Sequence, residues 1–218
     1  MLAVDTTTPR GSVALVSGGE VLGEVRLRSA ARHSHSVMPA IAFLLEALGL
    51  GPAEVEAFAV AAGPGSFTGL RIGISTVQGL ALASGRPCLA LCALDVLAAR
   101  MRGAAPCLVP LIDAYRGEVY AGVYDTEGRP LGSWRVEAPG SLVAGLPDDA
   151  AFLGDGAVRY RDQILGLRPL ARFPGRSLFL AGTLGVLAEP RLQAGEGGPA
   201  EGLRPLYLRS PHIRPPAG

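Results

Sequence analysis

An order of three short β-prone runs followed by helical segments occurs twice along this chain. The runs occupy residues 1–5, 12–17 and 21–27 in the first set and residues 107–113, 118–125 and 131–137 in the second. Turn signals such as Pro9-Arg10-Gly11 and Thr126-Glu127-Gly128 separate them. The first run of each set ends in an aspartate, Asp5 or Asp113. The repeat predicts two lobes, each built on an antiparallel three-stranded meander.

Helical periodicity places the remaining elements around these meanders. Apolar spacing predicts helices over 34–48, 70–84 and 93–101, with strands at 57–62 and 88–91. Shorter units follow the second meander at 141–145, 151–153, 158–165 and 182–189. We expect an α/β fold with an N-terminal lobe over 1–103 and a C-terminal lobe over 104–190. Each lobe should hold a mixed sheet flanked by helices. The Gly- and Pro-rich residues 191–218 should lie on the body as an extended tail that is strand-like only at 206–208.

Composition favours a soluble, cytoplasmic protein. The 218 residues are 49% hydrophobic and 18% charged, with a net charge of +1, which gives this chain alone no general attraction for nucleic acid. Three cysteines are too few for a disulfide framework. The first residues show no secretory signal. The apolar stretch at 70–83 contains Arg71 and Gln78, so no membrane span is expected.

Residues 63–73 read GPGSFTGLRIG and lie where a buried strand should turn into a helix. Ser66 or Thr68 can cap that helix, and a helix N-terminus beside Gly65 can hold an anion. The segment is neither a Walker A motif nor a G-x-G-x-x-G motif. A tight structural turn, in which the glycines permit close packing, explains the same residues. The residues alone leave both interpretations open.

This string, together with the opening LAVDTT, resembles the TsaB/YeaZ family. Residues 112–120, which include Ile112-Asp113-Ala114 and Arg116-Gly117-Glu118, and residues 205–209 (PLYLR) extend the resemblance over nearly the whole chain. The resemblance implies the duplicated two-lobed fold of actin, hexokinase and the DnaK chaperone. It also implies a role in adding the threonylcarbamoyl group of threonylcarbamoyladenosine to transfer RNA.

In that fold, nucleotide phosphates lie between two hairpins whose turns need glycine. The first hairpin has Asp5 and Thr6, but threonines, a proline and Arg10 fill its turn. The second has Asp113, but Tyr115, Arg116 and Glu118 stand where small, uncharged residues are needed. Asp5 and Asp113 then simply cap turns. We expect no ATP hydrolysis and no cofactor, and the nucleotide or anion candidates are Asp5, Thr6, Gly65, Ser66, Thr68 and Asp113.

The resemblance also implies a test for metal. The catalytic relative, TsaD, is known for an H-x-x-x-H pair on a helix, and the matching positions here are Ala93 and Leu97. His33 and His35 are two residues apart and should point to different sides, and His212 is isolated in the tail. We therefore expect no metal site. No serine or cysteine nucleophile has an evident histidine and acid partner, so no catalytic residue is expected.

The helices predicted at 34–48 and 70–84 are apolar on nearly all sides, which indicates burial on more than one side. One side can face the sheet of the lobe, and the other would be an exposed apolar surface typical of an interface. Neighbouring elements of the same chain could cover that surface instead. The candidate interface residues are Val37, Ile41, Leu44, Leu45, Leu70, Arg71, Ile74 and Val77.

These observations favour a non-catalytic accessory subunit that pairs with a TsaD-type paralogue. The resemblance implies a TsaE-type ATPase as a further partner, contact with transfer RNA through the complex, and homodimerisation when the paralogue is absent. Two alternatives share the fold. A small-molecule kinase needs glycine-lined phosphate turns, and a glycoprotease-like metallopeptidase needs the histidine pair. A free-standing RNA-binding module is disfavoured, since the aromatic residues (6%) are scattered along a near-neutral chain.

Overall fold

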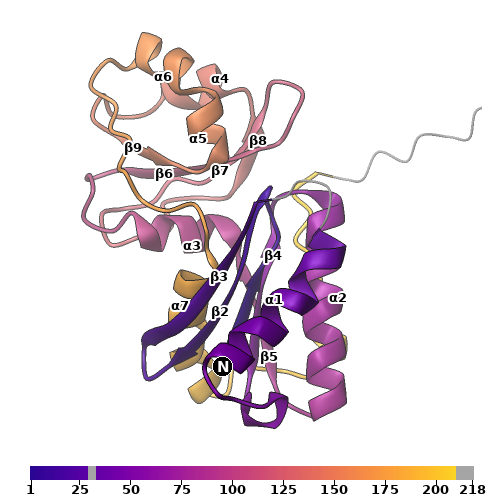
Figure 1. Cartoon of the computed structure of the whole chain (residues 1–218). Helices are drawn as coiled ribbons and strands as arrows, with labels where there is room; N and C mark the ends of the chain where they lie inside the picture. Colours follow the sequence, from indigo (N-terminus) through magenta and orange to yellow (C-terminus); the bar gives the residue numbers. More distant parts are fainter. Residues whose placement is uncertain (29–32, 210–218) are drawn as a thin grey trace, which may run out of the picture.

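A computed structural model describes residues 1–28 and 33–209 and shows two lobes, each built around one sheet (Figure 1). The first sheet contains β1 (Leu2–Asp5), β2 (Arg10–Ser17), β3 (Glu20–Arg28), β4 (Phe58–Gly63) and β5 (Cys88–Cys92) in the order β3-β2-β1-β4-β5. β1, β2 and β3 pair antiparallel, which confirms the first meander. β4 and β5 continue the sheet in parallel with β1.

Alternation along β1 sends side chains into two separate cores. Leu2 and Val4 point to the face covered by α1 (His33–Ala47) and α2 (Phe67–Ser84), while Ala3 points to the opposite face. On that opposite face the small side chains let α3 (Ala93–Arg100) and α7 (Ala181–Gln193) approach closely. The predicted helices at 34–48, 70–84 and 93–101 therefore exist, with ends shifted by up to three residues.

Capping fixes the ends of α2. The Ser66 hydroxyl accepts a hydrogen bond from the Gly69 amide at 3.3 Å, which confirms Ser66 as the N-cap residue. At the other end Gly85 adopts a left-handed conformation with φ of 67°, a backbone that glycine tolerates at no steric cost.

The second lobe repeats the meander. β6 (Leu108–Asp113), β7 (Val119–Ala121) and β8 (Arg135–Glu137) pair antiparallel, and β9 (Ala151–Leu153) joins β6 in parallel. Three short helices, α4 (Pro139–Ala144), α5 (Asp155–Arg159) and α6 (Arg161–Leu167), follow. A buried network links this lobe to α3: Tyr124 donates to Asp95 at 2.6 Å and accepts from the Trp134 indole at 3.0 Å.

The helix expected near 182–189 belongs with the first sheet, which corrects the boundary drawn at residue 190. α7 packs on β1 and β2, where Gly185 presses against Val16 and the Ser12 hydroxyl accepts from the Ala181 amide at 3.0 Å. Small residues on α7 make this approach possible, and the interpretation from sequence order alone missed it because the contact joins distant segments.

After α7 the chain returns along the first lobe as a C-terminal strap, residues 198–209 (Figure 1). Gly198 bridges Cys88 on β5, Gln78 on α2 donates to the carbonyls of Ala200 and Leu203, and the Leu206 amide donates to Ala62 on β4. The strand-like segment expected at 206–208 is irregular. The rest of the expected tail, with His212, lies outside the described residues. Within the described ranges no helix is long and apolar enough to span a bilayer.

Candidate functional site

The first hairpin uses its polar groups internally. Asp5 is fully buried at the end of β1, and its Oδ1 accepts hydrogen bonds from the Thr7 amide at 2.9 Å and the Thr7 hydroxyl at 2.7 Å. Its Oδ2 is buried without a partner among the described residues. Burial raises the pKa of Asp5 to about 6, although the Thr7 hydrogen bonds favour the charged form. Asp5 thus stabilises its own turn through hydrogen bonds, while burial disfavours the ionised form of its carboxyl group.

The glycine-rich segment is pressed against this hairpin. The Ser66 amide donates to the Thr7 carbonyl at 2.7 Å, and the Thr6 hydroxyl donates to the Gly69 carbonyl at 2.7 Å. A Cβ on Gly65 would meet the Thr7 carbonyl, and one on Gly69 would meet the Thr6 carbonyl. Of the two interpretations left open by the residues, the geometry favours close packing, because a side chain at Gly65 or Gly69 would collide with the backbone of the first hairpin.

The second hairpin is also engaged. Asp113 accepts from the Tyr115 amide at 3.1 Å and pairs with Arg159 at 3.1 Å, and its own amide donates to Asp155 at 3.2 Å. Burial raises the pKa of Asp155 above its usual range. Glu118 pairs with Arg209 of the strap. The carboxylates of this hairpin therefore already have partners within the chain.

Both hairpins border a polar hollow of about 310 Å³. Thr8 and Pro9 of the first hairpin, Tyr115 of the second, and the N-terminal ends of α1 and α2 line it. The fold thus brings Ser66 and Thr68 to this hollow, whereas Asp5, Thr6, Gly65 and Asp113 are not part of its lining. His33 forms part of the wall and its Nε2 lies 3.0 Å from the Thr8 carbonyl.

The positions matched to a metal pair face the core. Ala93 and Leu97 are buried on α3 among apolar side chains. His33 is buried while His35 is exposed, in line with their expected divergence. Within residues 1–28 and 33–209, no group of three or more histidine, cysteine or acidic side chains is arranged to hold a metal ion.

The interface residues expected on α1 and α2 need a correction. Seven of the eight are buried in the chain's own core against the first sheet, and only Arg71 is exposed. The strongest apolar stripe of a helix is the one that holds it on its own sheet, and helical periodicity alone points to that stripe. The buried seven are Val37, Ile41, Leu44, Leu45, Leu70, Ile74 and Val77.

The outward side of the same two helices is nevertheless apolar. Phe43 on α1 is 62% exposed and Leu82 on α2 is 67% exposed. Met38, Ala42 and Ala47 on α1 and Ser75, Gly79 and Ala83 on α2 are also exposed. We call the set of these eight residues the outer helical face.

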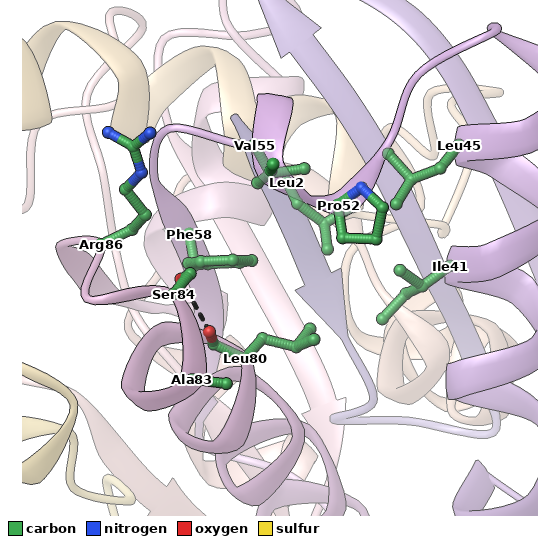
Figure 2. Close-up of a pocket in the computed structure, with 11 residues that line it drawn as sticks. Leu2, Ile41, Leu45, Pro52, Val55, Phe58, Leu80, Ala83, Ser84 and Arg86 are labelled. Atoms are coloured by element: carbon green, nitrogen blue, oxygen red, sulfur yellow. Dashed lines mark hydrogen bonds between the residues drawn. The ribbon is translucent and has the colours of Figure 1, made fainter.

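A hollow of about 370 Å³ opens between the C-terminal halves of the two helices (Figure 2). Ile41 and Leu45 border it from α1, Leu80 and Ala83 border it from α2, and Phe58 lies at its base. Two of the expected interface residues therefore line an apolar cavity beside the outer helical face, although they are buried. Its lining fits an aliphatic or aromatic side chain.

A cluster that the sequence analysis did not identify lies where α2 meets the strap. The rings of Phe67 and Tyr207 stack with centroids 5.4 Å apart, and the Arg71 guanidinium lies 3.9 Å above the Phe67 ring. Arg71 therefore belongs to this cluster. Across the hollow, Tyr115 and Arg116 adopt left-handed backbone conformations with φ of 59° and 55°. Such conformations cost about 1–2 kcal/mol per non-glycine residue.

Comparisons with known proteins agree with the fold and the motifs. The family described as TsaD, tRNA N6-adenosine threonylcarbamoyltransferase, matches residues 20–141. The Bacillus subtilis tRNA threonylcarbamoyladenosine biosynthesis protein TsaB is 33% identical over 155 residues, which cover 71% of this chain and 63% of that protein. The chain thus spans less than two thirds of that relative.

Solved structures extend the likeness over the whole fold. YeaZ from Pseudomonas aeruginosa is 36% identical with a TM-score of 0.81, covering 95% of this chain and 98% of that one. The Acidaminococcus fermentans (R)-2-hydroxyglutaryl-CoA dehydratase component A has a TM-score of 0.57 at 9% identity, which shows a shared fold alone. The chain belongs to the TsaB/YeaZ family.

Proposed function

We propose that this chain is a non-catalytic accessory subunit in the biosynthesis of threonylcarbamoyladenosine on transfer RNA. In this role it pairs with a TsaD-type paralogue, which transfers a threonylcarbamoyl group to the adenosine next to the anticodon. The names of its relatives support the pathway. A TsaE-type ATPase is the further protein partner, and the cytoplasm is the compartment.

The state of the cleft supports the absence of chemistry in this chain. A phosphate-binding hairpin needs free backbone amides, but the Thr7 amide binds Asp5 and the Ser66 amide binds Thr7. Asp113 is neutralised by Arg159. The aspartate of each hairpin thus accepts a hydrogen bond from an amide of its own turn, Thr7 for Asp5 and Tyr115 for Asp113.

The outer helical face is the single observation that carries the proposed pairing. Its apolar side chains, with Phe43 and Leu82 at 62% and 67% exposure, have no cover from the described part of the chain. The small residues Gly79 and Ala83 allow a partner helix to approach closely, and the neighbouring hollow offers a seat for an apolar side chain. The same face suits a second copy of this chain when the paralogue is absent.

The test is association with the TsaD-type paralogue of the same organism, measured by light scattering after size-exclusion chromatography. Leu82→Glu and Phe43→Glu should each weaken the complex at least about tenfold, because each buries a charge in an apolar contact. Leu170→Glu is the matched control, since Leu170 is 68% exposed on the second lobe. Its complex should form as in the wild type.

The same variants also show whether a loss of association comes from unfolding of the chain. Both positions on the outer helical face are exposed, so the glutamate variants should keep the wild-type circular dichroism and melting behaviour. A charge at Leu44 or Ile74 would instead unfold the lobe, because both side chains are buried. Full association of a Leu82→Glu, Phe43→Glu double variant would refute the proposed pairing surface.

The kinase alternative is tested with the purified chain and magnesium–ATP in a titration calorimeter. We expect no heat of binding at concentrations that saturate kinases of this fold. Tight binding or turnover by the chain alone would instead favour the kinase.

A further inference from the structure

Exposed aromatic side chains lie around the polar hollow between the two hairpins, whose opening we call the cleft mouth. Four aromatic side chains are exposed among residues 1–28 and 33–209, namely Phe43, Phe67, Tyr115 and Tyr207. Phe43 belongs to the outer helical face, and the other three border the polar hollow between the hairpins or the strap beside it. We call Phe67, Arg71, Tyr115, Arg116 and Tyr207 the cleft-mouth cluster.

Several contacts place these residues on one rim. Tyr115 lines the hollow together with Thr68, the residue after Phe67. Tyr207 stacks on Phe67, and Arg209, two residues further along the strap, donates to the Ala114 carbonyl and pairs with Glu118. The strap thus passes from the α2 end of the rim to the second hairpin (Figure 1).

Two arginines on this rim have no carboxylate partner in the described ranges. Asp113 is paired with Arg159 and Glu118 with Arg209, while Asp155 is largely buried behind Asp113 and accepts from its amide. Arg71 and Arg116 form no ion pair with any carboxylate in the described ranges. Arg71 instead lies over the Phe67 ring and donates to the Tyr207 hydroxyl at 3.5 Å, so both guanidinium groups lack an acidic partner among the described residues.

The backbone at Tyr115 and Arg116 is strained. Tyr115 and Arg116 occupy left-handed conformations that asparagine or glycine would adopt more easily. Such strain at exposed residues is typical of positions held for contact with a ligand rather than for stability.

We infer that the cleft-mouth cluster is a contact surface for single-stranded RNA, with bases stacking on the rings and phosphates beside Arg71 and Arg116. Stacking on aromatic rings and guanidinium planes, combined with unpaired cations, is how proteins hold unpaired bases. The outer helical face differs in chemistry, since none of its eight residues is charged and it has one aromatic ring, that of Phe43. The chain thus offers one surface for protein on the first lobe and another for RNA where the two lobes meet.

This inference rests on the proposed function for the identity of the RNA, which is the anticodon loop of transfer RNA. It gives this chain a direct share in substrate binding within the complex. Scattered positions in the sequence concealed the cluster, because residues 67, 115 and 207 meet only in the folded chain.

The probe is a fluorescein-labelled, unmodified anticodon stem–loop, and its affinity for the complex with the TsaD-type paralogue is measured by fluorescence anisotropy. Tyr207→Ala and Tyr115→Asn should each weaken binding about tenfold, the loss expected for one stacked base. Arg116→Asn should weaken binding and reduce the slope of log affinity against log salt by about one. Arg129→Ala is the matched control, an exposed arginine after β7, and should bind as the wild type does.

The two asparagine variants separate binding from folding. Asparagine tolerates a left-handed backbone, so Tyr115→Asn and Arg116→Asn should raise the melting temperature while RNA affinity falls. Unchanged affinity in the stable asparagine variants would overturn the inference. Equal competition by a fully paired RNA duplex would also overturn it, because stacking needs unpaired bases.

Assembly is measured on the same samples before RNA is added. Loss of the protein complex in cleft-mouth variants, with RNA affinity intact at saturating paralogue, would show that the rim binds protein and would reject the RNA contact. If the wild-type chain forms no complex, the proposed function fails. The same probe is then titrated against the chain alone, where equal affinity of wild type and variants would reject the inference independently.

Discussion

Replacing Asp5 with asparagine should remove the pH dependence of folding stability that comes from ionisation of the buried Asp5 carboxyl group. Asp5 is fully buried, and this raises its pKa from 3.8 for a free side chain to about 6. The folded chain thus holds the proton more tightly than the unfolded chain does. The stabilisation is fully present below pH 3.8 and is lost as the pH rises through about 6.

The size of the effect follows from the shift. About two pKa units at about 1.4 kcal/mol each correspond to about 3 kcal/mol of folding free energy. Asparagine cannot ionise, and its Oδ1 can still accept both hydrogen bonds from Thr7. Its Nδ2 replaces an oxygen that has no partner in the described structure, which costs about 1–3 kcal/mol at every pH.

The measurement is urea unfolding of wild type and Asp5→Asn between pH 4 and pH 8, followed by circular dichroism. The free energy of unfolding of the variant, relative to the wild type, should rise by about 3 kcal/mol across this range. Thr7→Val provides a second test, because losing the hydroxyl hydrogen bond should move the wild-type transition to higher pH. Parallel stability curves for wild type and Asp5→Asn would refute the assignment of a raised pKa to this buried carboxyl.

Three further predictions concern packing and polar contacts. Gly69→Ala should destabilise the chain by about 1–3 kcal/mol, because its Cβ would meet the Thr6 carbonyl. Gly79→Ala, on the same helix but facing open space, should stabilise it by about 0.5–1 kcal/mol, and thermal unfolding compares the two. Tyr124→Phe should cost about 1–3 kcal/mol in urea unfolding, because it leaves Asp95 and the Trp134 indole without their shared partner.

Local patterns predicted most of the elements and the family. The spacing of apolar residues located α1 and α2, and the turn signals located both meanders. Ser66 or Thr68 was predicted as the cap because a capping hydroxyl acts within one turn of helix, and the structure selects Ser66. The GPGSFTGLRIG string indicated the family through its resemblance to TsaB/YeaZ sequences, whereas its turn and cap alone left the role of the segment open.

Contacts between distant segments could not be predicted in the same way. The seven buried residues of α1 and α2 were assigned to a partner because periodicity shows that a side is apolar but not what covers it. α7 was placed with its sequence neighbours, although Gly185 fits only against Val16 of the first sheet. Tyr207 gave no signal by itself, because its role depends on Phe67, which lies 140 positions earlier in the printed sequence.

The C-terminal strap has a mechanical consequence. Its Leu206 amide is bound to Ala62 in the first lobe, and its Arg209 is bound to Ala114 and Glu118 in the second. Enzymes that close two lobes over a ligand depend on a hinge that swings freely. In this chain, such a movement of the lobes would have to break the contacts of the strap with one of them. The contacts of the strap with both lobes therefore oppose a change in the angle between them, in this chain and in any assembly that contains it.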